Sequence, residues 1–339
     1  MIVGLSEAID HHFSLFLKSP YGKHTMKHLT TLVLGWALSA AAFAAQPLLS
    51  PTELQAKLNN PQVRVIDIRD AKAYAASHIA GSVNAPYGTW RGPAHNPGEL
   101  PELSKLTTLV QSLGLSPATH AVVVSSGADA TDFGATARVY WTLKVLGLKE
   151  LSVLNGGLKA WSEAGLTQNA DAVKIAASNF QPKLDNSQVA TKEELIQRVK
   201  TGDATLIDAR PAAFFNGETK APAAKLAGTL EGAVNLQHDK WFAPGSSAFV
   251  TADQAKKIAA ASPIDPAKET VSFCNTGHWA ATNWFAMSEV LGQKNVKLYA
   301  GSMVEWSQDP NGLPMANVPG RTTQLLQDAK AWGVKAFSK

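Results

Sequence analysis

The sequence predicts an α/β protein made of two related domains, each with a mainly parallel sheet flanked by helices. Three observations lead to this class. The 339 residues are too many for one ordinary core and suit two domains of about 130 residues each. One stretch of sequence occurs twice, and short apolar strands alternate with helical segments in both copies. With 45% hydrophobic and 17% charged residues, the chain is expected to fold around two sizeable cores.

The repeat is clearest between residues 146–161 (LGLKELSVLNGGLKAW) and residues 291–306 (LGQKNVKLYAGSMVEW), which align without gaps. Two shorter pairs also match: VIDIRD at 65–70 with LIDARP at 206–211, and HIAGSVN at 78–84 with TLEGAVN at 229–235. We therefore expect one domain over 48–166 and a second over 189–320.

Helix-start signals open both domains. Ser50 is followed by Glu53, and Thr191 by Glu194, so each pair combines an N-cap hydroxyl with a glutamate three residues later. The strands expected after them are short apolar runs: 63–67, 121–125 and 151–155 in the first domain, and 205–209, 270–274 and 296–300 in the second. Because strands alternate with helices, each sheet should be mainly parallel and covered on both faces.

Two segments connect or follow the domains. Residues 167–188 are polar, contain a proline and several Asn and Asp residues, and are expected to form the linker. Residues 321–339 are expected to form a C-terminal helical tail, with Leu325, Leu326 and Trp332 on its apolar side.

Residues 1–44 are expected to be a signal peptide, which would make the mature protein periplasmic. A basic start at Lys27 precedes an apolar run over 29–43 that is short for a membrane span. The run ends in the triplet Ala42-Phe43-Ala44, which suits signal peptidase. Met26 is an alternative start, in which case the residues before it are a spurious extension. An uncleaved anchor helix is the alternative interpretation; after cleavage no membrane segment is expected.

The composition argues against nucleic acid and metal ions as binding partners. The formal net charge is +4 and the lysines are scattered, which argues against nucleic-acid binding. One cysteine, Cys274, and scattered histidines offer no paired motif for a metal ion. An unpaired cysteine in an exported protein is either inaccessible or reactive.

The sequence around Cys274 favours reactivity. Cys274 ends a buried strand and opens the loop CNTGHW, which leads into a helical segment that finishes at Gly292. Backbone N–H groups in such a turn, with the positive end of the helix behind them, favour thiolate over thiol and can hold a substrate oxyanion. Gly277 gives this loop backbone freedom. We therefore predict that Cys274 is a sulfur nucleophile.

With these motifs, residues 48–320 resemble a tandem rhodanese that has an inactive first domain and a catalytic second one. The resemblance rests on the Asp-x-Arg strand end, the G-x-V-N turn, the six-residue loop that opens with Cys, and the G-G-x-x-x-W segment, present here as GGLKAW. In the first domain, Ser125 stands where Cys274 stands in the second.

The resemblance implies a sulfurtransferase that works through a Cys274 persulfide. The thiolate would take the outer sulfur from thiosulfate or a related small anionic donor, release sulfite, and pass the sulfur to a thiol, cyanide or a protein acceptor. No metal or organic cofactor is implied. The loop residues expected to bind the substrate are Asn275, Thr276, Gly277, His278 and Trp279.

The sequence leaves two alternative functions open. Phosphatases of the same fold need one more loop residue and an arginine six residues after the cysteine, where this chain has Ala280. The second is a persulfide carrier that turns over simple donors poorly, because two positions depart from the family. The loop contains no lysine or arginine, and Phe214 occupies a position where members that act on thiosulfate often have arginine.

Residues found in only one domain are the better candidates for chemistry. Asp208 and Arg210 have counterparts in the domain without cysteine, Asp67 and Arg69, which favours a buried structural ion pair. His278 could add positive charge or move a proton.

Other residues are candidates for the walls of the site. Trp279 is expected to line the pocket or pack between domains. His238 and Trp241 would either line the cleft or lie on an exposed loop. The candidates for the missing positive charge are Lys220, Lys225 and Lys240.

Overall fold

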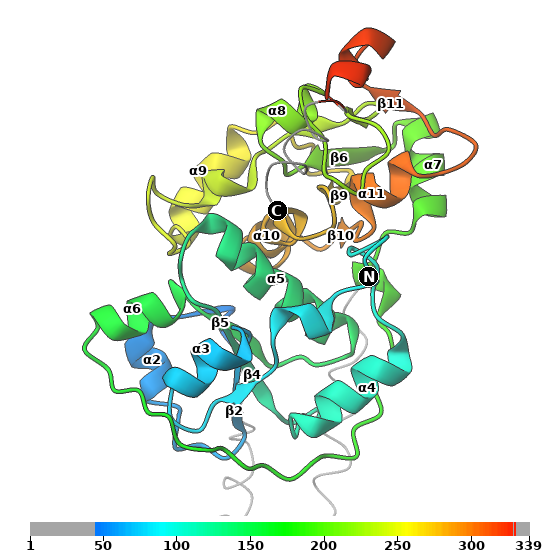
Figure 1. The fold of residues 1–339 in the computed structure, drawn as a ribbon. Helices are drawn as coiled ribbons and strands as arrows, with labels where there is room; N and C mark the ends of the chain where they lie inside the picture. Colours follow the sequence, from blue (N-terminus) through cyan, green and yellow to red (C-terminus); the bar gives the residue numbers. More distant parts are fainter. Residues whose placement is uncertain (1–44, 328, 330–339) are drawn as a thin grey trace, which may run out of the picture. The chain divides into compact units, whose positions relative to one another are not determined.

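The computed structural model describes residues 45–327 and 329. The predicted signal segment 1–44 and Trp332 of the predicted tail lie outside these residues. The described chain forms two α/β domains (Figure 1), which belong to one compact unit. Within this part of the chain, no helix is both long and apolar enough to cross a membrane.

The first domain contains a five-stranded sheet in the order β1-β5-β4-β2-β3, and every neighbouring pair is parallel. Its strands are β1 (Leu48–Leu49), β2 (Val63–Asp67), β3 (Val83–Asn84), β4 (His120–Val124) and β5 (Leu151–Leu154). Its helices are α2 (Pro51–Gln55), α3 (Ala71–Ala76), the 3₁₀ turn η1 (Tyr87–Trp90), α4 (Leu103–Ser112), α5 (Ala130–Val145) and α6 (Gly157–Glu163).

The second domain contains a four-stranded parallel sheet in the order β10-β9-β6-β8. Its strands are β6 (Ala204–Asp208), β8 (Val234–Asn235), β9 (Glu269–Phe273) and β10 (Val296–Leu298). A short antiparallel pair joins β7 (Thr229–Leu230) to β11 (Met315–Ala316). The helices are α7 (Lys192–Thr201), α8 (Ala212–Phe215), the 3₁₀ turn η3 (His238–Trp241), α9 (Ala252–Ala260), α10 (Trp279–Trp284), the π-helix η4 (Phe285–Val290) and α11 (Ser302–Ser307). The predicted α/β class with two mainly parallel sheets is confirmed.

Local signals placed several element ends correctly. Ser50 and Thr191 each form a capping box with the glutamate three residues later. Strand β9 ends at Phe273, one residue before the predicted end, so Cys274 follows the strand. The helix expected to run to Gly292 is instead a short α-helix continued by a π-helix, a rare geometry that sequence spacing does not distinguish from α.

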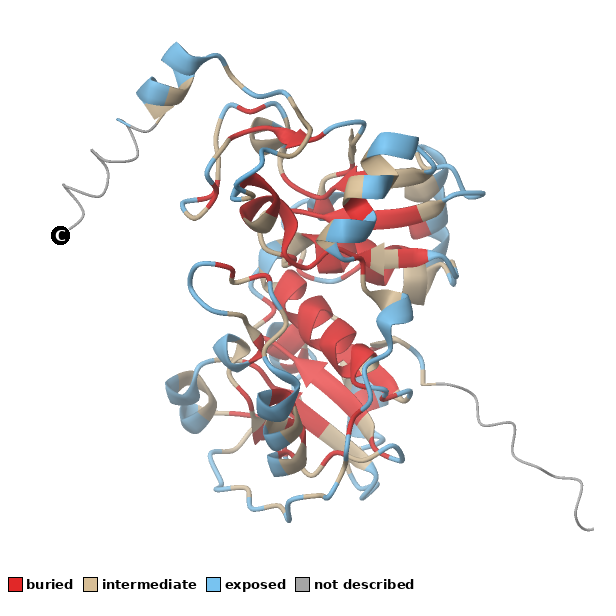
Figure 2. Ribbon diagram, turned by 90° about the vertical axis from the view of Figure 1, so that its right-hand side faces the viewer, coloured by how far each residue is buried: buried red, intermediate tan, exposed pale blue. Residues whose placement is uncertain are grey.

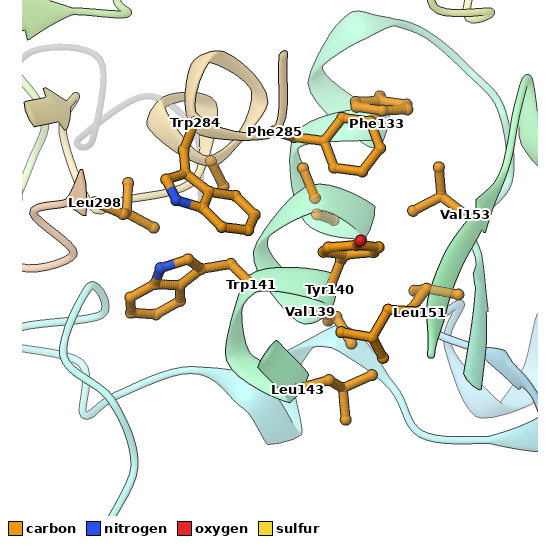
Figure 3. Packing of buried hydrophobic residues seen from close by; sticks show 14 of the residues in the cluster. Phe133, Val139, Tyr140, Trp141, Leu143, Leu151, Val153, Trp284, Phe285 and Leu298 are labelled. Atoms are coloured by element: carbon orange, nitrogen blue, oxygen red, sulfur yellow. The ribbon is translucent and has the colours of Figure 1, made fainter. Parts of the chain in front are cut away.

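Helix α5 explains how the domains pack. It is buried on nearly all sides, because it covers β4 and β5 of its own sheet and also packs against α10 and η4 of the second domain. Figure 2 shows it buried along most of its length, and Figure 3 shows Tyr140 and Trp141 of α5 beside Trp284 and Phe285. This shared core places the second domain's cysteine loop, which immediately precedes α10, against the first domain.

The connecting segments are irregular. From 167 to 185 the backbone forms no helix or strand, and Asn169 and Ser178 hydrogen-bond to His78 and Gln111 of the first domain. The 3₁₀ turn η2 (Asn186–Gln188) then leads into the second domain. Residues 321–327 are helical, but Leu325 and Leu326 are 64% and 60% exposed.

Candidate active site

The single cysteine lies at the carboxyl edge of the second sheet. Cys274 follows β9 directly and is 1% exposed. It contributes to a pocket of about 150 Å³. The residues around this pocket are Thr131, Cys274, Asn275, Thr276, His278 and Trp279. The structure thus brings four of the five predicted loop residues together with Cys274, while Gly277 lies outside the lining.

Gly277 has a steric role. Its φ of +65° lies in the left-handed region, and a Cβ atom there would come within 2.5 Å of Arg138 Nη1 and 2.6 Å of the Ala300 carbonyl oxygen. A side chain would therefore displace the loop from its supports.

Ser302, which sequence reasoning missed, anchors the loop. Its Oγ accepts hydrogen bonds from the amide groups of Cys274 and Gly277, both at 3.0 Å, and donates to the Tyr299 carbonyl at 2.8 Å. Its φ is +55°, and the aligned position in the first domain is Gly157, with φ +59°. The signal was present in the sequence: serine replaces the second glycine of GGLKAW in the second repeat.

Other loop amides remain available. Within residues 45–327, the N–H groups of Asn275, Thr276 and His278 have no acceptor in the protein. The first domain offers an internal comparison, because there the N–H of Gly127, in the loop that follows Ser125, donates to the Asp132 carboxylate at 2.6 Å. In the first domain, the Asp132 carboxylate therefore binds an amide of the loop after Ser125. In the second domain, amides of the corresponding loop after Cys274 have no acceptor within the described residues.

His278 is a neutral wall of the pocket. Its Nε2 lies 2.7 Å from the Thr131 carbonyl; because a carbonyl only accepts, Nε2 carries the hydrogen and Nδ1 accepts from the Tyr87 hydroxyl at 2.8 Å. Burial, and then the positive charge of Arg91, lower the pKa of His278 from 6.5 to about 4. At neutral pH this ring contributes no positive charge.

Aromatic side chains form one side of the site. Trp279 donates from Nε1 to Thr131 Oγ1 at 3.2 Å, so it both lines the pocket and contacts the first domain. His238 stacks on Trp279 with ring centroids 4.9 Å apart, and Phe214 meets Trp279 edge-on at 5.9 Å. Trp241 is instead a core residue, fully buried and hydrogen-bonded to Asn283.

The Asp208–Arg210 pair is structural and also touches the loop. Arg210 Nη2 lies 2.6 Å from Asp208 Oδ2 and donates to the Gly228 carbonyl. The first domain has the equivalent pair, with Arg69 Nη2 2.6 Å from Asp67 Oδ2. Only in the second domain does the arginine reach further, from Nη1 to Asn275 Oδ1 at 3.3 Å.

The first domain supplies two more arginines that sequence reasoning missed. Arg91 Nη2 donates to the Thr276 carbonyl at 2.8 Å, and Arg138 Nη1 donates to the Gly277 carbonyl at 3.3 Å. No local pattern links positions so far apart in sequence, so only the packing of the first domain against the cysteine loop reveals them.

None of the three lysines considered as charge donors, Lys220, Lys225 and Lys240, lines the pocket around Cys274. Lys240 lines a separate pocket of about 470 Å³ together with Asp129 and Asp239. Lys220 Nζ donates to the Lys225 carbonyl at 3.1 Å.

Comparison with known proteins agrees with this architecture. The family model described as "Rhodanese-like domain" matches residues 50–164 and 191–309. A "Thiosulfate sulfurtransferase" from Azotobacter vinelandii is 32% identical, over 79% of this chain and 97% of the relative. A "Putative thiosulfate sulfurtransferase" from Synechococcus elongatus is 30% identical, over 85% of this chain and 91% of the relative.

A solved structure shows the same fold. The 3-mercaptopyruvate sulfurtransferase of Escherichia coli superposes with a TM-score of 0.67 at 24% identity, covering 76% of this chain and 99% of that one. Two family matches in one chain, two parallel sheets and relatives aligned over most of their length agree with each other. The chain therefore belongs to the rhodanese family, with two rhodanese-like domains in tandem, and is a rhodanese-type sulfurtransferase.

Proposed function

We propose that Cys274 accepts sulfur from a small anionic donor, carries it as a persulfide, and passes it to a thiol or cyanide. The observation that carries this proposal is the place of the chain's single cysteine, in a pocket beside loop amides that face no acceptor within residues 45–327. Such amides stabilise negative charge on a nearby sulfur or oxygen.

The chemistry divides into two displacements at sulfur. The Cys274 thiolate attacks the outer sulfur of thiosulfate, the S–S bond of the donor breaks, and its electron pair leaves with sulfite. A new S–S bond then joins the transferred sulfur to Cys274. A thiolate or cyanide attacks that outer sulfur, and Cys274 departs again as a thiolate. Because each attacking and leaving group is an anion, neither step needs a proton.

Thiosulfate is the donor we favour. Relatives at 30% and 32% identity bear the name thiosulfate sulfurtransferase. The aromatic surface of Phe214 and Trp279 also suits a more apolar donor, so a thiosulfonate and 3-mercaptopyruvate belong in the same comparison. A protein thiol is a further candidate acceptor.

His278 serves in this scheme as a positioned neutral side chain. Its two ring nitrogens are engaged by Tyr87 and Thr131, which ties the cysteine loop to the first domain. With thiosulfate as the donor, the acid–base role considered from sequence has no step to act on.

Intact-mass measurement tests the proposal. Wild-type protein incubated with each donor should gain the mass of one sulfur, and Cys274→Ser should gain none while melting almost as wild type does. Ser125→Ala is the matched control, because Ser125 holds the corresponding place in the first domain, and it should load normally. Loading that persists in Cys274→Ser would refute the mechanism. A persulfide that forms but is not discharged to thiol or cyanide would indicate a carrier instead.

We also propose that the protein is exported. The support is the apolar run 29–43 and the cleavage triplet ending at Ala44. N-terminal sequencing of protein recovered from a bacterial periplasm should begin at Ala45 or Gln46; an intact N-terminus in a membrane fraction would contradict export.

A further inference from the structure

Arg91 and Arg138 of the first domain contact the cysteine loop, and their hydrogen bonds go only to uncharged groups. Arg91 donates to the Thr276 carbonyl, and Arg138 donates to the carbonyls of Gly277 and Gly98, at 3.3 Å and 2.7 Å. In the described part of the chain, the arginines with a carboxylate partner are others: Arg69, Arg198 and Arg210.

This arrangement is costly for a protein without a bound anion. Arg138 is fully buried, and neither its Nε nor Nη1 of Arg91 has a hydrogen-bond partner in the described chain. A buried cation without an opposite charge destabilises the folded state. Burial, and then repulsion by Arg91, lower the pKa of Arg138 from 12.5 to about 9, so the guanidinium keeps its charge at neutral pH.

The other ionisable groups around the loop do not supply that anion. Tyr87 has its pKa raised, mainly by burial, and stays protonated. The ring of His278 is neutral. Asp208 is already paired with Arg210, so its negative charge is matched within the second domain.

We propose that Arg91 and Arg138 are positioning residues that supply the positive charge for the anionic forms of Cys274. They replace the basic residues that the loop itself lacks, and the charge comes from the domain that has no cysteine. The two guanidinium groups support the loop through consecutive carbonyls, Thr276 and Gly277. The first domain is therefore part of the active site and more than a structural partner. This inference rests on the proposed function in taking the anion to be the thiolate or persulfide of Cys274.

Thiolate absorbance in the near ultraviolet tests the proposal without requiring sulfur transfer. The chain has one cysteine, so the absorbance difference between each protein and the same protein carrying Cys274→Ser reports this thiolate alone. Arg138→Gln and Arg91→Gln should each move the pH midpoint of thiolate formation upward by about one unit, since a nearby opposite charge shifts such a midpoint by about 1–3 units. Persulfide loading near neutral pH should fall roughly tenfold in parallel.

Arg64→Gln is the matched control. Arg64 belongs to the same domain, is partly buried and also has an Nε without a partner, but it lies near the amino end of β2, away from the cysteine loop. It should leave the midpoint unchanged.

An unchanged midpoint in folded Arg138→Gln and Arg91→Gln would overturn the proposal. If Arg138→Gln does not fold, the partly exposed Arg91 decides alone. A midpoint shift in the arginine variants, combined with no persulfide in wild type, would leave the charge assignment standing and refute the proposed function. Normal persulfide loading in wild type, with no midpoint shift in the arginine variants, would support the proposed function and refute the charge assignment.

Discussion

Replacing Ser302 tests the anchor of the cysteine loop. Ser302→Ala removes the acceptor for the amides of Cys274 and Gly277, and the donor to the Tyr299 carbonyl. Ser302 is 0% exposed, so water does not easily replace these partners. Each buried amide left unsatisfied costs about 1–3 kcal/mol, and the two together lower the free energy of unfolding by about 2–6 kcal/mol.

Ser302→Gly separates hydrogen bonding from backbone strain. It loses the same hydrogen bonds, but glycine adopts a φ near +55° without the cost of about 1 kcal/mol or more that other residues incur. The glycine variant should therefore be more stable than the alanine variant by about that amount. Both should load sulfur more slowly, because the amides of Cys274 and Gly277 are no longer held in place.

Urea unfolding and intact-mass loading provide the assay. Ser272→Ala is the matched control: this serine is equally buried and lies in strand β9, but its Oγ makes a single hydrogen bond, to the Ala280 carbonyl at 3.0 Å. It should cost about 1 kcal/mol and leave loading close to wild type. If Ser302→Ala unfolds and loads like Ser272→Ala, the Ser302 hydroxyl does not anchor the loop and our reasoning fails.

Two further predictions concern Phe214, which lies beside the pocket, and His278, which lines it. Phe214→Arg places a cation beside Trp279 and should lower the KM for thiosulfate by roughly tenfold, since a charge-assisted hydrogen bond contributes about 1.5–3 kcal/mol. The KM for a thiosulfonate should stay the same or rise, and steady-state kinetics with both donors measures the two values. Lost stability without a lower KM for thiosulfate would show that Phe214 is structural. The pKa of His278, lowered from 6.5 to about 4 in the folded protein, means that the unfolded chain takes up a proton first as pH falls, so the free energy of unfolding should drop by up to about 3 kcal/mol between these pH values. Urea unfolding of His278→Gln should lack this component; an identical pH dependence in the variant would contradict it.

Features that depend on short stretches of sequence were predictable. The capping boxes at Ser50 and Thr191 formed as expected, because their partners lie three residues apart. The repeat and the alternation of apolar strands with helices predicted two parallel sheets. Helices cover both faces of a parallel sheet, so its strands are short runs of apolar residues. That Cys274 is the nucleophile stays a prediction, which the mass experiment addresses.

Features that depend on domain packing were not predictable. The tautomer of His278 is set by Tyr87 and Thr131, and the loop carbonyls are held by Arg91 and Arg138. These partners lie in a different domain from the loop. Hydrophobic periodicity could not find them, since it reports which face of an element is buried and not which distant side chain meets it.

The sequence by itself determined the fold class, the two-fold repeat and the place of the single cysteine just after a central strand. Only the tertiary structure decided the electrostatics of the pocket around that cysteine. The physical reason is that α5 is buried on nearly all sides between its own sheet and α10. This packing carries Arg138 of the first domain to the Gly277 carbonyl and keeps the nearby His278 ring neutral by burial.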